Sequence, residues 1–223
     1  MKKFELTNEF ITNMFGTKLF RIRALVEFGD VEAGELGGYV EKESNLGHDD
    51  NAWVYDNAWV YGDAQVSGDA LVYGNAWVYG DAQVSGDALV YGNAWVYGDA
   101  QVSGDALVYG NAWVYGDAQV SGDARVYGNA RVCGDARVCG NGDYAYAHGF
   151  GSVNRTTTFF RLKDGGVGVR CGCFYGTLAQ FRDKIRETHG ETKKAQEYLM
   201  LADLMELRFE EDENEVGNRK YVE

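Results

Sequence analysis

Histidine is the side chain best suited to proton transfer at neutral pH, and this chain of 223 residues contains three of them. His148 lies in the glycine-rich segment GNGDYAYAHGFGS, close in sequence to Asp143 and Tyr146, and is the one weak candidate for a catalytic base. His48 and His189 read as ordinary polar residues. Because catalysis needs several groups in distinct roles, the sequence favours a protein that is not an enzyme.

Four cysteines could bind a metal or form disulfides, but their spacing favours neither. Cys133 and Cys139 are six positions apart, and Cys171 and Cys173 form a CxC pair rather than the CxxC of common zinc sites. A site with four thiolates on zinc is the alternative to reduced thiols, which we expect in a cytosolic chain. The sequence predicts no metal and no cofactor.

Positive charge is absent from the middle of the chain and returns towards its C-terminal end. The net charge is -13, and no lysine or arginine lies between Lys42 and Arg125. Basic residues beyond this stretch are candidates for ligand binding, unless they are solvated strand residues whose stems cover apolar surface. These candidates are Arg155, Arg161 and Arg170, with Thr156 and Thr157 between them.

Residues 51–141, which separate the histidine near the N-terminus from the candidate catalytic base and the candidate ligand-binding arginines, form a tandem repeat of six residues. Valine recurs at every sixth position from Val54 to Val138, with alanine two positions before each one and glycine two positions after nearly all. The block GDAQVSGDALVYGNAWVY occupies 62–79 and recurs at 80–97 and 98–115. Inward valine and alanine, closed by Gly-Asp or Gly-Asn, predict a short strand and a tight turn. Three units then make one triangular coil of a parallel β-helix, in which each strand pairs with its equivalent one coil away.

The outward positions of the repeat sort into ladders, one set on each side of the triangle. One side carries leucine with tyrosine, and another carries glutamine with serine. The third side is aromatic, and it is the candidate surface for self-association or for another protein, because a monomer rarely exposes so large an apolar strip. Carbohydrate binding on stacked rings is an alternative. This aromatic ladder contains Trp59, Trp77, Trp95 and Trp113 beside Tyr61, Tyr79, Tyr97 and Tyr115.

Carboxylates at the turns form two columns along the coils. They are expected to accept hydrogen bonds within their own turns, with weak Ca²⁺ binding as the alternative. An acidic rod repels nucleic acid, so we expect no direct nucleic-acid binding by it. The same charge could instead imitate a nucleic acid and inhibit a host protein. One column contains Asp63, Asp81, Asp99, Asp117 and Asp135, and the other Asp69, Asp87, Asp105 and Asp123.

Two motifs of the chain resemble known proteins. The recurring VSGDA and VYGNA are similar to hexapeptide-repeat proteins, which implies a left-handed, triangular β-helix. The opening LFRIRALVEFGDVEAGELGGYVEKESNL, followed by NAWVY, resembles YdcK-like hexapeptide-repeat proteins of bacteria and their phages. Some hexapeptide proteins transfer acyl groups with a histidine from the coils, so acyltransferase activity is an alternative by analogy of fold. The coils of this chain contain no histidine.

The C-terminal part predicts a small α+β module. Its hairpin, TTTFFRL and VGVRCGCF around KDGG, precedes two helices that begin at Thr177 and Thr192, the first in capping-box form with Gln180 and with Gly190 as its end. The segments FGSVNRTTTFF and CGCFYGTL are similar to a module of phage hexapeptide-repeat proteins. The expected domains are a cap at 1–50, the β-helix at 51–141, a linker at 142–154 and a ββαα module at 155–223.

These observations predict a mainly β protein that acts through binding. We expect a non-enzymatic scaffold, encoded by a phage or prophage, whose β-helix forms a dimer or trimer or binds another protein and presents the C-terminal module. No apolar run is long enough for a membrane span, and the N-terminus lacks the apolar stretch of a signal peptide. The expected location is the cytoplasm of the bacterial host, or the virion.

Overall fold

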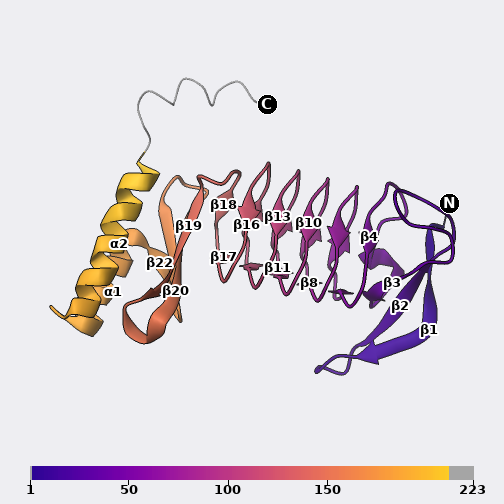
Figure 1. Cartoon of the computed structure of the whole chain (residues 1–223), viewed down its shortest axis with the longest axis horizontal. Coiled ribbons are helices and arrows are strands. Elements are labelled where there is room, and N and C mark those ends of the chain that lie inside the picture. Colours follow the sequence, from indigo (N-terminus) through magenta and orange to yellow (C-terminus); the bar gives the residue numbers. More distant parts are fainter. Residues whose placement is uncertain (1, 211–223) are drawn as a thin grey trace, which may run out of the picture. The chain divides into compact units, whose positions relative to one another are not determined.

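The computed structural model describes residues 2–210, and the chain forms two compact units, Met1–Tyr144 and Ala145–Glu223. The first unit is a β-solenoid preceded by an antiparallel sheet, and the second is a four-stranded sheet with two helices. Figure 1 shows the stacked coils of the first unit. The mainly β fold with a parallel β-helix and a small C-terminal α+β module is therefore confirmed. The left-handed twist stays a prediction of the resemblance.

The N-terminal strands join the antiparallel sheet directly to one side of the solenoid. β1 (Phe4–Thr12) and β2 (Lys18–Ala24) pair antiparallel, as do β2 and β3 (Leu36–Val40), but β3 pairs parallel with β5 of the coils. Leu46, just after the 3₁₀ helix η1 (Glu43–Asn45), forms a parallel bridge with Val66. The expected cap at 1–50 is thus shorter, because residues from β3 onward already form the first coil.

Each side of the solenoid is a parallel sheet with strands of two to four residues. The aromatic face has β5 (Trp59–Val60), β8 (Trp77–Gly80), β11 (Trp95–Gly98), β14 (Trp113–Tyr115) and β17 (Arg131–Cys133). The glutamine face has β6 (Gln65–Val66), β9 (Gln83–Val84), β12 (Gln101–Val102), β15 (Gln119–Val120) and β18 (Arg137–Val138). The leucine face has β4 (Trp53–Val54), β7 (Leu71–Val72), β10 (Leu89–Val90), β13 (Leu107–Val108) and β16 (Arg125–Val126).

The pairing register within each face equals the eighteen-residue repeat. Val78 pairs with Val96 and Val96 with Val114, and the other two faces repeat this offset. Every valine from Val54 to Val138 and every alanine from Ala52 to Ala130 along the coils is fully buried. These small side chains fill the narrow interior of the triangle, so the expected in–out alternation is confirmed.

Glycine stands at the turns for two physical reasons, as Gly80 illustrates. Its φ is +76°, in the left-handed region that side chains disfavour. A Cβ added there would also lie 2.9 Å from the backbone nitrogen of Gly98 and 3.2 Å from its oxygen, in the next coil. The turns therefore stack backbone on backbone, which leaves no room for a methyl group.

The N-terminal strands cover the first coil. Trp53, which pairs with Leu71 at the start of the leucine face, is fully buried, with its ring edge-on to Phe4 and Phe28 at centroid distances of 6.2 and 5.3 Å. Lys3 is also buried, and its amine donates to the carbonyls of Asp50 and Ala52 at 3.2 and 2.9 Å. Burial lowers the pKa of this amine, against the attraction of the Asp50 carboxylate.

The C-terminal unit has more strands than the expected ββαα arrangement. Its sheet has the order β19-β20-β21-β22. The expected linker at 142–154 contains a whole strand and a 3₁₀ helix, and a further strand follows the predicted hairpin. The elements are β19 (Tyr144–Phe150), η2 (Ser152–Asn154), β20 (Arg155–Arg161), β21 (Val167–Cys171), β22 (Phe174–Thr177), α1 (Leu178–His189) and α2 (Lys193–Phe209).

Both helices begin at the predicted capping residues, and the first ends at the predicted glycine. The Thr177 hydroxyl accepts from the Gln180 amide at 3.3 Å, and the Gln180 side chain accepts from the Thr177 amide at 2.9 Å. Gly190 ends α1 at a φ of +56°, and Thr192 caps α2. No helix within residues 2–210 is both long enough and apolar enough to cross a bilayer.

The apolar face of α2 is narrower than its sequence indicates. Tyr198, Ala202 and Met205 are buried in the core of the unit, whereas Leu204 and Leu207 are 54% and 68% exposed. The two leucines lie on the far side of the helix because they are rotated from the buried positions by the 3.6-residue period.

Candidate functional site

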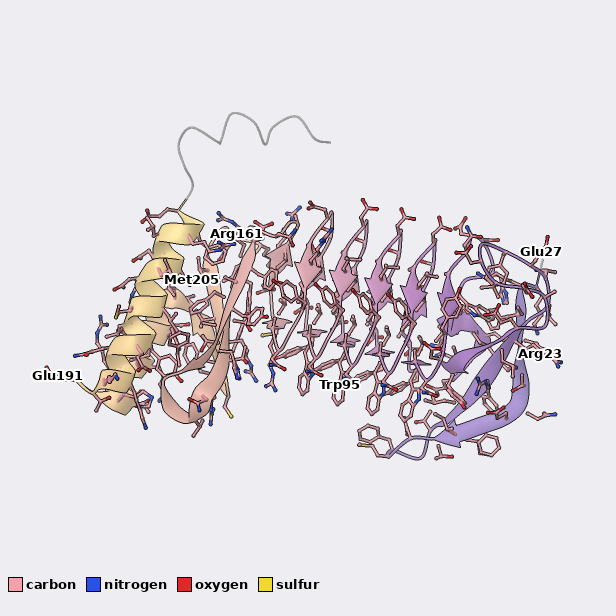
Figure 2. The ribbon with its side chains drawn as sticks, in the orientation of Figure 1. Arg23, Glu27, Trp95, Arg161, Glu191 and Met205 are labelled. Carbon is pink, nitrogen blue, oxygen red and sulfur yellow. The ribbon has the colours of Figure 1, made fainter. Side chains whose placement is uncertain are left out.

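The aromatic face of the solenoid carries two ladders of stacked rings. Successive indoles from Trp59 to Trp113 have centroids 4.5–4.8 Å apart and planes within 8° of parallel. The tyrosines from Tyr61 to Tyr115 stack at 4.9–5.0 Å. Figure 2 shows Trp95 projecting from the outside of the coils. The sequence-predicted ladders are therefore brought together in register.

Each ring in these ladders presents its edge, rather than its face, to the outside. Both faces of Trp95 are covered by Trp77 and Trp113, and the Tyr79 ring meets it edge-on at 6.5 Å and 73°. Sugar recognition by stacking needs a free ring face, and the interior rungs offer none. The face therefore suits a flat protein surface better than a carbohydrate.

The two ends of the aromatic face are closed by different residues. At the C-terminal end the guanidinium of Arg131 lies over the Trp113 ring, with Cζ 4.3 Å from the centroid. At the N-terminal end Tyr61 packs with Leu19 and Tyr39 and is only 8% exposed. Tyr61 was predicted as an interaction residue, and the structure places it largely under the N-terminal sheet instead.

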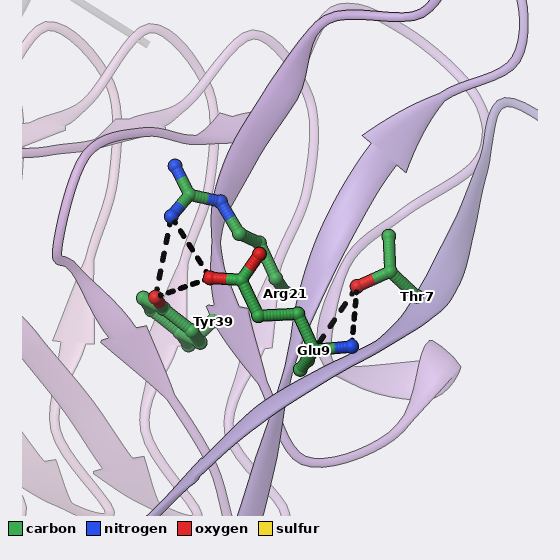
Figure 3. A network of polar contacts seen from close by, with 4 residues as sticks. All are labelled: Thr7, Glu9, Arg21 and Tyr39. Carbon is green, nitrogen blue, oxygen red and sulfur yellow. Dashed lines mark hydrogen bonds and ion pairs between the residues drawn. The ribbon is translucent and has the colours of Figure 1, made fainter.

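Sequence reasoning missed the polar network that holds this N-terminal end, shown in Figure 3. Glu9 accepts from the Tyr39 hydroxyl at 3.2 Å and from Arg21 at 3.3 Å, and Arg21 also donates to the Tyr39 hydroxyl at 3.2 Å. Thr7 accepts from the Glu9 amide at 3.2 Å. These residues come from three strands of the N-terminal sheet, so no local sequence pattern predicts their contacts. Their role is to fix the Tyr39 ring against Tyr61.

Burial raises the pKa of several tyrosine hydroxyls in the ladders. Desolvation is the main cause for Tyr61 and Tyr79, and for Tyr79 the neighbouring hydroxyls of Tyr97 and Tyr61 add to the shift. Tyr73 and Tyr91, on the leucine face, shift in the same direction. A ladder of parallel hydroxyls resists ionisation because each new phenolate would lie beside its neighbour. These four tyrosines therefore stay uncharged through the neutral range.

A second tyrosine ladder runs along the leucine face. Tyr73, Tyr91, Tyr109 and Tyr127 stack at 4.8–5.3 Å. Its last ring meets Tyr144 edge-on, and the Tyr144 hydroxyl donates to the carbonyl of Arg125. This ladder is thus closed at its C-terminal end as well.

The corners of the triangle carry the charge. In the aspartate columns every carboxylate is exposed except Asp135, which is half-buried. Two of these carboxylates bind side chains one coil away in sequence: Asp63 accepts from the Lys42 amine at 2.6 Å, and Asp69 accepts from the Asn51 side chain at 2.7 Å. Among residues 2–210, no three histidine, cysteine or acidic side chains are placed to hold a metal.

The third corner is a chain of amide hydrogen bonds. Asn75 donates to Asn93, Asn93 to Asn111 and Asn111 to Asn129, at 3.2–3.3 Å. An amide can donate and accept at once, whereas a carboxylate can only accept. This chemistry explains why asparagine, and not aspartate, can link one coil to the next at this corner.

The three histidines occupy separate places. His48 stacks on Phe4 at 4.6 Å and accepts from the Lys3 amide. His148 is exposed and shares a hydrogen bond of 2.8 Å with the Thr156 hydroxyl. His189 stacks on Tyr198 at 5.9 Å. The hydrogen bond of His148 is with a hydroxyl and not with Asp143 or Tyr146, the neighbours that made it a candidate.

The predicted ligand residues of the C-terminal unit do not converge. Arg161 donates to the Phe209 carbonyl at 3.1 Å, and its guanidinium lies over the Phe209 ring. Arg170 donates to the Cys173 carbonyl at 3.4 Å. Arg155 lines a pocket of the unit, and neither Arg161 nor Arg170 is among the residues that line it. All four cysteines are free thiols in the structure.

Among known protein families, a match is found within the repeat of the solenoid. The family model described as the YdcK beta solenoid repeat matches residues 64–80, 82–98, 100–116 and 118–134. No curated protein matches the chain. The matched segments together form the middle coils of the solenoid, whose aromatic side has six parallel strands including β3. This stretch of the chain is therefore a repeat β-helix similar to that of YdcK.

Proposed function

We propose that this protein is a non-enzymatic scaffold whose solenoid self-associates through its aromatic face and presents the C-terminal module. The observation that supports this most is the uncharged strip of half-exposed rings from Trp77 to Tyr115, which covers three successive coils. Tyrosine and tryptophan are enriched at protein interfaces because they combine a large apolar area with a polar group. An exposed strip of this kind marks an interaction surface.

A second copy of the chain is the partner that this geometry favours. Its aromatic face has the same spacing between rungs, so two faces can meet rung against rung over their whole length. Such contacts between identical surfaces give closed dimers related by a twofold axis. The carboxylates stand at the corners, outside the strip, where they remain solvated when two faces meet.

A single substitution in the strip tests the proposal, and the chain offers a matched control. Trp95→Arg puts a charge in the centre of the aromatic face, while Gln101→Arg makes the same change in charge on the glutamine face, six residues later. Arginine already occupies both ladders naturally, at Arg131 and Arg137, so the coils accept it. The mass in solution is measured by light scattering over a range of concentrations.

We expect the wild type and Gln101→Arg to form the same dimer, and Trp95→Arg to shift to monomers. Thermal unfolding of both variants shows whether the coils remain folded. A wild type that stays monomeric at high concentration contradicts the proposal, and so does an equal effect of the two substitutions.

An inhibitor that imitates nucleic acid is the second candidate, because the exposed aspartate columns form a regular line of charge without a basic residue between Lys42 and Arg125. It predicts that Asp81→Asn with Asp99→Asn abolishes capture of nucleic-acid-binding proteins from a bacterial lysate, while Trp95→Arg leaves that capture intact. Loss of this capture in Trp95→Arg alone favours the scaffold.

The remaining parts of the proposal rest on the sequence. The resemblance of the C-terminal segments to phage hexapeptide-repeat proteins supports a phage or prophage origin, and with it a place in the host cytoplasm or the virion. Acyl transfer remains an alternative by analogy of fold alone. Loss of acyltransferase activity in His148→Gln would be its direct signature.

A further inference from the structure

The C-terminal unit contains a pocket of about 270 Å³ that the scaffold role does not use. This volume corresponds to about nine water molecules at their share of the liquid, ~30 Å³ each, enough for a small organic ligand. The walls come from the turn between β21 and β22, from one side of α1, and from Tyr198 of α2. Because three elements of one folded unit form the walls, the pocket exists before any ligand binds.

The inner wall of the pocket is aromatic and rigid. Phe181, Ile185 and Tyr198 are each 3% exposed and belong to the core of the unit. The Phe181 ring meets Phe174 at 5.4 Å and Tyr198 edge-on at 5.8 Å. Because these rings pack directly against one another, they form a rigid apolar wall against which a flat apolar group can lie.

The mouth of the pocket carries positive charge. Arg155 is exposed and reaches over the turn after β21, where a Cβ on Gly172 would overlap its guanidinium. Gly172 has a φ of +58°, as the first residue of a two-residue hairpin turn requires. The side chain of Arg155 is thus accommodated by a glycine and held beside the pocket.

Arg155 differs from the other arginines of its sheet in having a guanidinium available for a ligand. Within the described part of the chain it makes no hydrogen bond or ion pair, whereas Arg161 and Arg170 both bind backbone carbonyls. The second cation, Lys184, pairs with Glu187 at 2.8 Å on the exposed side of α1. No acidic residue lines the pocket, in a chain whose net charge is -13.

We propose that this pocket binds a small aromatic carboxylate. The flat body of the ligand lies in the pocket against the wall formed by Phe174, Phe181 and Tyr198, and its carboxylate accepts from the guanidinium of Arg155. Arginine binds carboxylates with two parallel hydrogen bonds, which sets the orientation of the ligand as well as its charge. A cationic or neutral ligand of the same shape lacks this contact.

Two thiols at the pocket differ in a way that makes binding measurable. Cys171 is half-buried and accepts from the Thr157 hydroxyl at 3.2 Å, while Cys173 is exposed at the mouth. Cys139 is also exposed but belongs to the solenoid. A ligand in the pocket should shield Cys173 from a thiol reagent and leave Cys139 unaffected, which provides a control within the same molecule.

The experiment measures alkylation of the full chain by iodoacetamide, with peptide mass spectrometry reporting Cys173 and Cys139 separately. The probes are indole-3-acetate, the neutral indole-3-acetamide and the cation tryptamine. Arg155→Gln removes the proposed contact. The matched control is Arg186→Gln, which removes an exposed arginine of α1 that pairs with Asp183 and does not line the pocket.

We expect indole-3-acetate to slow alkylation of Cys173 in the wild type and in Arg186→Gln, without slowing that of Cys139. In Arg155→Gln the concentration needed for the same protection should rise about tenfold or more, as expected for the loss of a charge-assisted hydrogen bond. Equal protection by the amide or by tryptamine overturns the proposal. Unchanged protection in Arg155→Gln, or no protection of Cys173 at all, also overturns it.

Discussion

Arg131 lies over Trp113 in the position that the next indole of the stack would take. The two residues pair in register between β14 and β17, and the guanidinium carbon is 4.3 Å from the ring centroid. A planar cation can cover an aromatic face almost as another ring does, and it stays solvated on its outer side. The aromatic ladder thus ends without exposing the face of its last ring.

Replacing Arg131 by glutamine should uncover Trp113 and lower the free energy of unfolding by about 0.5–1 kcal/mol. Arg137→Gln is the control, because Arg137 follows Gln119 in the glutamine ladder and has no ring beneath it. Urea unfolding followed by tryptophan fluorescence compares the two variants. Equal losses would mean that the contact with Trp113 adds nothing to the general effect of the charge.

Gly80→Ala should destabilise the solenoid by at least ~1–2 kcal/mol, the cost of a side chain in the left-handed region alone. The close approach to Gly98 in the next coil adds to that cost. Gly142→Ala is the control, since an added Cβ there meets no atom within 4 Å and its φ is not positive. Thermal unfolding of both variants is the measurement, and a Gly80→Ala variant as stable as Gly142→Ala would contradict the stacking of turns.

Asn93→Asp should lower the free energy of unfolding by about 0.5–1 kcal/mol, because the new carboxylate cannot donate to Asn111 as the amide does. The reverse change at another corner, Asp99→Asn, should not lower the free energy of unfolding, because it removes one of several like charges in a column. Chemical unfolding at low and high salt separates the two effects, since salt screens exposed charges. A stable Asn93→Asp variant would show that the amide ladder is dispensable.

Stability should fall at alkaline pH because the folded state holds the protons of its buried tyrosines more tightly than the unfolded chain does. The pKa values of Tyr61, Tyr73, Tyr79 and Tyr91 are raised above the ordinary value of about 10. The stability that these protonated tyrosines contribute to the folded state is therefore complete below about pH 10, and it is lost as the pH rises further.

The urea midpoint, measured from neutral pH upward, tests this expectation. It should stay level until about pH 10 and then decline, with tyrosinate absorbance appearing together with unfolding. Tyr79→Phe removes one of these protons and should make the decline less steep. If the ladder tyrosines titrate at the ordinary pKa while the coils remain folded, the expected loss of stability at alkaline pH is refuted.

The solenoid could be predicted from the sequence because its contacts repeat with the chain. Trp77 and Trp95 stack because they are eighteen residues apart, and the paired core valines from Val54 onward obey the same offset. Once alternate residues must point inward, a shift of one residue would expose the whole core. The period therefore leaves one register, and with it the ladders and columns at the surface.

The ends of the solenoid could not be predicted in the same way. Phe4 and Trp53 meet across 49 positions of sequence that follow no period, and their contact changes an apparently outward tryptophan into a core residue. Tyr61 is buried for a similar reason, through Leu19 and Tyr39. Contacts between segments without a repeat depend on the path of the chain in space.

The sequence by itself determined the coils, their register, the aromatic and acidic ladders and the capping residues of both helices, because each depends on neighbours at a fixed spacing along the chain. Only the tertiary structure decided that Tyr61 and Trp53 are covered, that residues 144–150 add a strand to the C-terminal sheet, and that Arg155 lines a pocket between the sheet and the helices of its unit. These depend on distant segments meeting, and the free energy of that packing is not encoded in any local pattern.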